Sequence, residues 1–405
     1  MSATEAPPGL SPPPGNPRFA LFDSLRGLAA LTIVTFHVCS ITGALEKPVL
    51  GDVITVAGPR SLVLFFVISG FLLYRPYVAA HAEGRRGPRL SRYLRRRAFR
   101  IVPAYWVALT ALAIFPGIVG VFDDTWYRFY FFGQLYSHET VGAGIPVAWS
   151  LSVEVSFYLL LPLWAWGVSR TRLRSGGRSW LAAELVPLGL AMLVGVCVQI
   201  AVAQREISDL VGSSLLGQSV WLGLGMSLAV LSVAAQQGKL DPRVPAFVER
   251  RPGLLWIGAA ASLAGLTAVL DPAGLTGIIQ SLSSEQPVAE TLLAIALTAT
   301  LSGLIVLPAI FGEEAGGLPR RLLAAPLVAW FGLVSYGIFL WHLTTAQWLG
   351  VPESPSQFSG SGLNLANELP FAVTPILLIL TIAVTSALAA ASYYLVELPF
   401  LRRKD

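Results

Sequence analysis

Two ionisable side chains near the N-terminus have the types and the spacing to bind an anion and to move a proton. Arg26 and His37 lie in "LRGLAALTIVTFHV", which is otherwise free of ionisable groups. A helix turns ~100° and rises ~1.5 Å per residue, so both side chains share nearly one face with ~16 Å between their Cα atoms. Inside a membrane, such an arginine needs water, a partner or an anionic ligand, and such a histidine suits a general base. In the structural alternative, Arg26 snorkels to the interface and His37 bonds a helix carbonyl.

A lone carboxylate lies in the apolar stretch "VAWSLSVEVSFYLLLPLW". If this stretch descends from the outer side, Glu154 lies ~10 Å below that surface, close to the depth of His37. A carboxylate near an imidazole fixes its tautomer and stabilises the imidazolium, so we expect Glu154 to orient His37, with Trp149 at the outer end. The alternative is that Glu154 packs between helices, protonated or bonded to Ser150.

Two further apolar stretches each contain a polar candidate. "VSYGIFLWHLT" carries His342, which either lines an acceptor pocket or bonds across helices. "LFFVISGFLLYRP" places Ser69 beside Gly70, a pair that permits close helix approach. Ser69 and Tyr105 are candidate donors of hydrogen bonds to an oxyanion.

The run "RLSRYLRRRAFRIVPAYW" concentrates positive charge at the start of an apolar stretch. Its ordinary interpretation is a cytoplasmic stop signal. Arg97 and Arg100 lie at the mouth of the span that follows, beside Tyr105, where they could clamp a phosphorylated cytoplasmic ligand. Arg26 and Arg75 belong to the same inner half. Together these arginines predict a site for an anionic donor.

Membrane-spanning helices must position all of these residues. Hydrophobic residues make up 54% of the 405-residue chain and charged residues 13%, whereas roughly a quarter of an ordinary soluble domain is charged. Charge-poor runs long enough to cross ~30 Å of hydrocarbon predict an all-α polytopic protein with about ten spans. They lie near residues 20–42, 60–80, 101–121, 147–168, 181–203, 214–235, 253–270, 289–311, 327–349 and 370–396.

The distribution of positive charge predicts the orientation. Most of the 28 Lys and Arg residues fall in segments that are cytoplasmic if both termini are, and positive segments stay inside. The net charge of +5 is therefore mostly a topology signal with added attraction to anionic lipid, and no nucleic acid is needed to explain it. We expect a multi-pass protein of the plasma membrane.

One membrane domain, residues 19–401, is expected to carry the chemistry. Residues 1–18 are Pro-rich without an apolar core, which predicts a disordered cytoplasmic tail and no cleaved signal peptide, and residues 402–405 form a basic cytoplasmic tail. Cys39 and Cys197 are single residues within spans, so no disulfide framework or metal site is expected. The sequence does not indicate an oligomeric state.

Six short motifs occur together in the order of a known family. "FDSLRGLAALTIVTFH", "FFVISGFLL", "RRRAFRIVPAYW", "WSLSVEVSFY", "SYGIFLWH" and "VELPF" resemble the acyltransferase 3 family of membrane O-acyltransferases over about residues 19 to 401. The resemblance implies a ten-helix enzyme that moves an acyl group, commonly acetyl, from cytoplasmic acyl-CoA to a sugar hydroxyl of a glycan, glycolipid or glycoside. Arg26 and His37 match the family's Arg-x10-His pair, and Glu154 matches the acidic position of its Trp-Ser-Leu motif.

The residues and the resemblance together assign a catalytic set of His37, Glu154 and Arg26. His37 takes the proton of the acceptor hydroxyl or holds a transient acyl group, and both routes stay open. Substrate binding is assigned to Arg75, Arg97, Arg100, Ser69, Tyr105, Trp149 and His342. Acyl-CoA, acetyl-CoA in particular, is the expected donor, with no metal. The alternative is a transporter or flippase, since buried charges in many spans also describe a substrate pathway.

Overall fold

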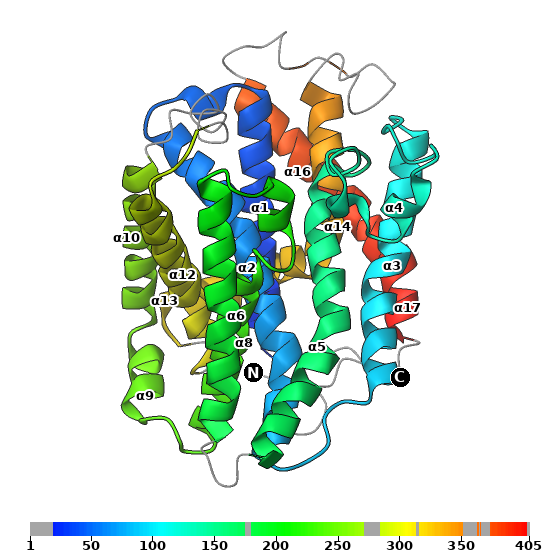
Figure 1. Ribbon diagram of the computed structural model, residues 1–405. Coiled ribbons are helices and arrows are strands. Elements are labelled where there is room, and N and C mark those ends of the chain that lie inside the picture. Colours follow the sequence, from blue (N-terminus) through cyan, green and yellow to red (C-terminus); the bar gives the residue numbers. More distant parts are fainter. Residues whose placement is uncertain are drawn as a thin grey trace.

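The described part of the chain is helical throughout. A computed structural model describes residues 19–174, 180–270, 284–312, 316–350, 363, 365 and 373–402. Figure 1 shows these residues as one bundle of upright helices. Over them no strand occurs, and ten helices are long and apolar enough to cross a membrane, which confirms the predicted all-α fold. The predicted tail, residues 1–18, and residues 403–405 lie outside the described residues.

Ten long helices form the spans, and shorter helices connect them. The spans are α1 (Leu21–Ile41), α2 (Leu50–Ala82), α3 (Leu90–Ile114), α5 (Trp149–Arg174), α6 (Trp180–Ala203), α8 (Ser219–Gln236), α10 (Pro252–Leu270), α12 (Val288–Ile310), α14 (Pro326–Gly350) and α16 (Val373–Ser392). The last continues through a π-helical turn, Tyr393–Glu397, into α17, Leu398–Arg402. The short helices are α4 (Trp126–Tyr130), α7 (Asp209–Ser213), α9 (Arg243–Arg250) and α13 (Gly317–Leu323).

Two spans begin earlier in the chain than the sequence predicts. α2 starts at Leu50 instead of near residue 60, so its 33 residues measure ~50 Å and exceed the membrane core. α3 runs over Leu90–Ile114 instead of 101–121. Arginine is a good helix former, so the basic run continues the apolar span as one helix. At the other end Pro116 disfavours helical geometry in the residue before it, and the helix stops.

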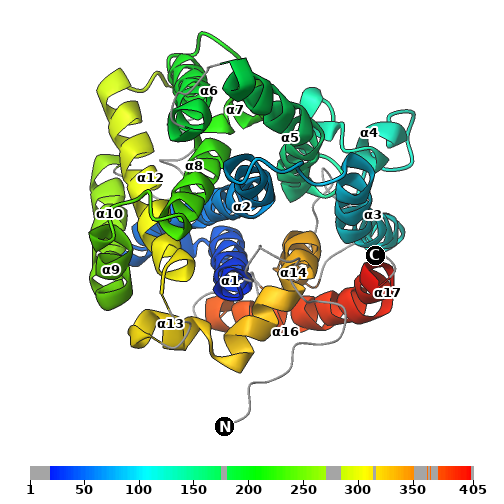
Figure 2. The same ribbon diagram turned by 90° about the horizontal axis from the view of Figure 1, so that it is seen from below.

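Helices α1, α2, α8 and α14 lie in the middle of the bundle, and the other spans surround them (Figure 2). Glycines let these central helices approach closely. A methyl group added to Gly27 would lie 2.6 Å from the backbone nitrogen of Gly332, and one added to Gly70 would lie 2.3 Å from the carbonyl oxygen of Leu222. Small residues permit such crossings in membranes. The first crossing holds α1 against α14, the helices that carry the two candidate histidines, His37 and His342.

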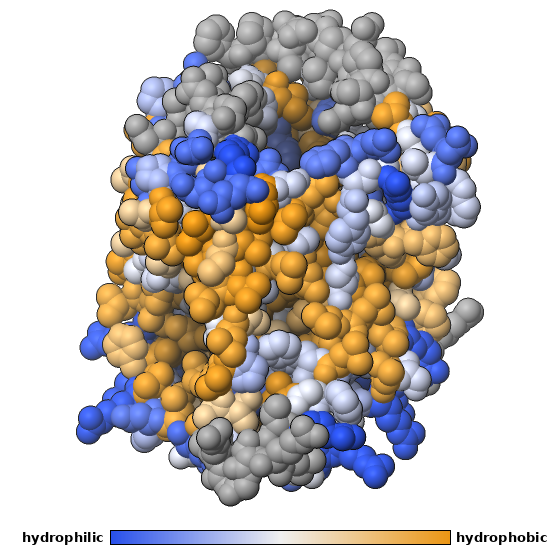
Figure 3. All heavy atoms as spheres, viewed as in Figure 1, coloured by the Kyte–Doolittle hydropathy of each residue, from blue (hydrophilic) through white to orange (hydrophobic). Residues whose placement is uncertain are grey.

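The outer surface has the pattern of a membrane protein. On the face shown in Figure 3, apolar side chains cover the middle of the molecule and polar side chains gather at both ends. Because the number of spans is even, α1 begins and α17 ends on the same side, which is also the side of the basic turn between α2 and α3 (Figure 1). We name this the inner side and the opposite one the outer side.

Candidate active site

Three cavities follow one another through the bundle from the inner to the outer side, each sharing lining residues with the next. The basic cleft, of about 610 Å³, lies between α2 and α3 and shares Leu72, Leu73 and Arg97 with the inner cavity. The inner cavity measures about 370 Å³ and the outer cavity about 520 Å³. Where these two meet, four apolar side chains line both and form what we name the apolar neck: Leu62, Phe65, Phe66 and Phe339.

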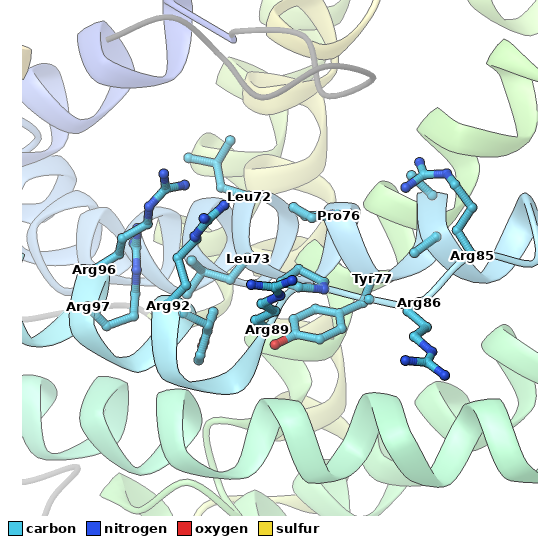
Figure 4. A pocket seen from close by; sticks show the side chains of 15 residues that line it. Leu72, Leu73, Pro76, Tyr77, Arg85, Arg86, Arg89, Arg92, Arg96 and Arg97 are labelled. Carbon is cyan, nitrogen blue, oxygen red and sulfur yellow. The ribbon is translucent and has the colours of Figure 1, made fainter. Parts of the chain in front are cut away.

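Arginine side chains dominate the walls of the basic cleft. Figure 4 shows them along α3 and the turn before it, around Tyr77. The lining arginines are Arg85, Arg86, Arg89, Arg92, Arg96 and Arg97, with Tyr93 as a second aromatic ring. Guanidinium groups match phosphate oxygens in charge and geometry, and aromatic rings offer a surface for stacking. The cleft therefore suits a phosphorylated ligand.

Arginines from two helices meet in the inner cavity. Arg26 of α1 lies there with Arg97 and Arg100 of α3, so the structure brings three of the predicted donor residues together. Asp23 and Glu154 add carboxylates, and Arg26 Nη1 lies 3.5 Å from Asp23 Oδ1. The carboxylates offset part of the cost of burying three cations. A polar cavity of this kind within apolar spans suits a charged or strongly polar ligand.

Aromatic and amide side chains line the outer cavity, which also contains His37. Around it lie Trp149, Trp221, Gln199, Gln218 and Gln286, together with the charged residues Arg60 and Glu290. Flat rings combined with amide donors and acceptors suit a polyhydroxylated ligand. Trp149 thus shares a cavity with His37, as the sequence predicts.

A second histidine holds His37. His37 Nδ1 lies 3.1 Å from His342 Nε2, a contact that joins α1 to α14. His342 Nδ1 lies 3.0 and 2.9 Å from the carbonyl oxygens of Ile338 and Phe339, so Nδ1 carries the proton of neutral His342. His342 Nε2 is then an acceptor, and His37 Nδ1 donates to it. This assignment leaves the lone pair on His37 Nε2, the arrangement of a general base with an orienting partner.

Glu154 does not take the orienting position predicted for it. Its Oε1 accepts a hydrogen bond from Ser69 Oγ at 3.0 Å, and its Oε2 accepts one from Tyr158 OH at 2.7 Å. It lines the inner cavity, whereas His37 lines the outer one. The prediction that Glu154 orients His37 is therefore wrong, because α14 packs against α1 and supplies His342 in that place. Ser69 joins the inner cavity through the same hydrogen bond.

Three predicted substrate-binding residues line none of the three cavities: Arg75, Tyr105 and His342, which bonds across helices to His37. Arg75 is buried between α2 and α8, where it donates to Ser232 Oγ at 3.3 Å and to Gln236 Oε1 at 2.6 Å. Tyr105 is fully buried and donates its hydroxyl hydrogen to the carbonyl of Phe129 at 3.0 Å. Arg75 and Tyr105 each tie neighbouring segments together, a structural role that differs from the predicted substrate binding.

The structure also adds lining residues that the sequence analysis does not select. The outer cavity gains Arg60, Gln199, Gln218, Trp221 and Glu290, and the inner cavity gains Tyr158 and Glu397. Arg60 and Glu397 could have been selected from the sequence, because each is a charged residue beside or within an apolar stretch. The amides and Trp221 could not, because such residues are common in membrane helices. Among the described residues, no group of three His, Cys, Asp or Glu side chains could hold a metal ion.

The fold and the family together define a membrane acyltransferase. A sequence model described as an acyltransferase domain matches residues 19–390, and the chain belongs to this family, acyltransferase 3. It is 28% identical over 207 residues to "Acyltransferase MdmB" of Streptomyces mycarofaciens, a match that covers 48% of this chain and 50% of that protein. It is also 28% identical over 188 residues to "Protein 2 in picA locus" of Rhizobium radiobacter, covering 44% of this chain and 92% of that protein. No solved structure matches the chain significantly.

Proposed function

We propose that the protein is an O-acyltransferase that moves an acyl group, acetyl in particular, from acyl-CoA on the inner side to a sugar hydroxyl in the outer cavity. One observation carries the proposal. His37, held through Nδ1 by His342, lines the outer cavity, and only the apolar neck separates that cavity from an arginine-lined one. A base and a polyanion site on the two sides of one neck suit a donor with phosphates at one end and a thioester at the other.

The donor fits the inner half by its charge. Its phosphates match the arginines of the basic cleft, and its polar, uncharged arm matches the inner cavity, where Arg26, Arg97 and Arg100 stand with hydroxyl and carboxylate groups. The thioester then reaches the apolar neck. The acceptor enters from the other side, where rings and amides can hold its hydroxyl groups.

The reaction needs one base and one orienting group. His37 Nε2 takes the hydroxyl proton while the hydroxyl oxygen attacks the thioester carbonyl carbon. A C–O bond forms, the C–S bond breaks, and the thiolate of coenzyme A leaves with the electron pair and then receives the proton from His37. His342 keeps the ring in the reactive tautomer and spreads the positive charge that develops on it. A two-step route, in which His37 first accepts the acyl group, has the same overall balance.

The proposal assigns the inner side to the cytoplasm, where acyl-CoA is made. Positive segments stay in the cytoplasm, and the basic turn between α2 and α3 lies on the inner side. In a Cys197→Ser background, Arg86→Cys should resist an impermeant thiol reagent in intact cells while Lys47→Cys reacts. The reverse labelling pattern would contradict the orientation and with it the sides given to donor and acceptor.

A paired experiment tests the activity. Purified protein should bind acetyl-CoA, and a deletion strain should lack an acetyl ester on a glycan or glycoside that the parent strain carries, as measured by mass. Reintroduced wild type should restore the ester and His37→Ala should not. Loss of a compound from one side of the membrane with unchanged acylation, and no acetyl-CoA binding, would instead indicate a transporter.

A further inference from the structure

Arg60 is an intramembrane arginine that the reaction proposed above does not use. It lies in α2 near the level of His37, since the ring of the neighbouring Phe36 packs against Gly58, two residues before Arg60. Its side chain is part-buried, and no hydrogen bond or ion pair joins it to another residue among those described. Glu290, in the same cavity, forms no ion pair with it. Such a residue needs a ligand or a route to water.

Two cavities meet at this arginine. Arg60 and Ser61 line the outer cavity and also a fourth cavity, of about 310 Å³, between α1, α2, α10 and α12, which we name the lateral cleft. Leu28, on its wall, is 39% exposed, so the cleft opens sideways, at the apolar surface of the bundle that faces the lipid. The lateral cleft therefore faces hydrocarbon at one end and the candidate acceptor site at the other.

The walls of the lateral cleft are apolar over a considerable length. They consist mainly of Leu25, Leu28, Ala29, Leu64, Trp256, Ala259, Ala260, Leu263, Leu301 and Ile305. The hydroxyls of Thr32 and Ser61 donate to carbonyls of their own helices, at 3.0 and 2.6 Å. From Thr32, near the middle of α1, to Leu25 the wall extends ~10 Å along α1, away from His37 and toward the inner side. These dimensions and this chemistry suit a hydrocarbon chain.

We infer that the acceptor is an amphiphile: its hydrocarbon chain lies in the lateral cleft, an anionic phosphate linkage binds Arg60, and its hydroxylated head group lies in the outer cavity beside His37. The order of the three surfaces along the molecule, apolar wall, guanidinium and then rings with amides, matches the order of the three parts of such a lipid-linked sugar. The inference rests on the proposed acyl transfer for the role of the head group, and on the two cavities and Arg60 alone for binding.

Binding of three probes to the full-length protein, in nanodiscs of neutral lipid and without donor, tests this inference. Farnesyl phosphoryl glucose has chain, phosphate and sugar; octyl glucoside lacks the phosphate; glucose 1-phosphate lacks the chain. The complete probe should bind at least about tenfold more tightly than either partial one, because a charged hydrogen bond and a buried chain each contribute more than 1.4 kcal/mol.

Two variants separate the parts of the site. Arg60→Gln should lower the affinity for the complete probe about tenfold and change that for octyl glucoside by less than about twofold. Arg128→Gln, on the same side but outside both cavities, should change neither affinity.

Ala260→Phe, which fills the lateral cleft, should lower the affinity for the two probes with chains and leave that for glucose 1-phosphate unchanged. Ala182→Phe, exposed on α6, is its control. If Arg60→Gln gives no folded protein, Arg60→Lys, which loses the planar fork, should weaken the phosphate probes selectively.

Equal affinity for the three probes, or equal effects of Arg60→Gln and Arg128→Gln, would overturn the inference and leave Arg60 as a snorkelling residue. Acetyl transfer from acetyl-CoA to octyl glucoside, measured on the same samples, separates this result from the fate of the proposed function. Transfer with binding that is independent of Arg60 removes the inference alone. Binding that depends on Arg60 without any donor binding keeps the lipid site and removes the acyltransferase proposal.

Discussion

The inner and outer cavities differ in the kind of side chain that lines them, although both lie within the same set of helices. The inner cavity has three arginines, two of them from the basic run of α3, with carboxylates and hydroxyls between them. The outer cavity has rings, amides and the His37–His342 pair, with Arg60 and Glu290 as its charged members among the described residues. The proposed function thus places binding by charge on one side of the apolar neck and proton transfer on the other.

Under the proposed function, this difference implies that donor and acceptor are recognised by separate physical means. A donor with several phosphates gains most of its affinity from fixed charges, which act on any acyl group it carries. The acceptor is selected by shape and by individual hydrogen bonds. Variants of the two cavities should therefore change different kinetic parameters, and four variants test that separation.

The largest effect should come from His37→Ala. Removing the proton acceptor should lower turnover by about a hundredfold or more while acyl-CoA affinity stays nearly constant, because the arginines of the inner cavity are untouched. Titration of donor binding beside steady-state acyl transfer measures both. His138→Ala, an exposed histidine on the outer side, should keep full activity. A folded His37→Ala protein with wild-type turnover would end the distinction between the two cavities.

A smaller loss should follow when His342 changes, because it positions His37 without touching substrate. His342→Leu leaves Nδ1 of His37 without its acceptor and should lower turnover by about ten- to a hundredfold. His342→Gln offers an amide oxygen near the same place and should recover part of that loss, and the pH profile of turnover should move in the leucine variant. If His342→Leu and His342→Gln have the same turnover and an unchanged pH profile, His342 contributes only packing.

On the inner side, Arg26→Lys should weaken donor binding and leave the rate of the chemical step nearly unchanged. Lysine keeps the charge but loses the planar fork that binds two oxygens, so the KM for acyl-CoA should rise about tenfold with little change in kcat. Arg170→Lys, an exposed inner arginine of α5 that packs on Trp166, is the matched control. A fall in kcat at constant KM would place Arg26 at the reacting atoms instead.

Glu154→Gln should give the smallest effect of the four. Glutamine has nearly the same shape and its amide oxygen still accepts one of the two hydrogen bonds that Ser69 and Tyr158 donate. Since Glu154 stands in the inner cavity, we expect a change of a few-fold, confined to donor KM. A loss of turnover as large as that of His342→Leu would instead indicate that Glu154 acts on His37, as the sequence analysis predicts.

The spans and the division between inner and outer halves could be predicted from the sequence, because composition and the separation of Arg26 from His37 along one helix determine them. The partner of His37 could not. Which helix faces α1 depends on packing between distant segments, here the crossing of Gly27 over Gly332, and depth alone left Glu154 and His342 equally placed. Arg75 shows the same limit, since an arginine that binds a ligand and one that binds Ser232 look alike in a sequence.

The start of α3 was predicted wrongly for a related reason. Hydropathy detects where a helix enters hydrocarbon and says nothing about how far it continues into water. The basic run before Ile101 therefore counted as a loop, although it is helical from Leu90 and its side chains line the basic cleft. The arginines of this run were visible in the sequence, but apart from Arg97 and Arg100 they were interpreted as a topology signal.

The apolar neck has a consequence for the electrical insulation of the membrane. Cavities that connect the two sides would conduct protons and salt if water filled them without a break, and each elementary charge that crosses a potential of 100 mV releases ~2.3 kcal/mol. Constrictions made of leucine and phenylalanine side chains, such as Leu62 and Phe66, exclude water when nothing else occupies them. In the proposed reaction, an uncharged acyl group would thus pass from one aqueous compartment to the other while the membrane keeps its voltage.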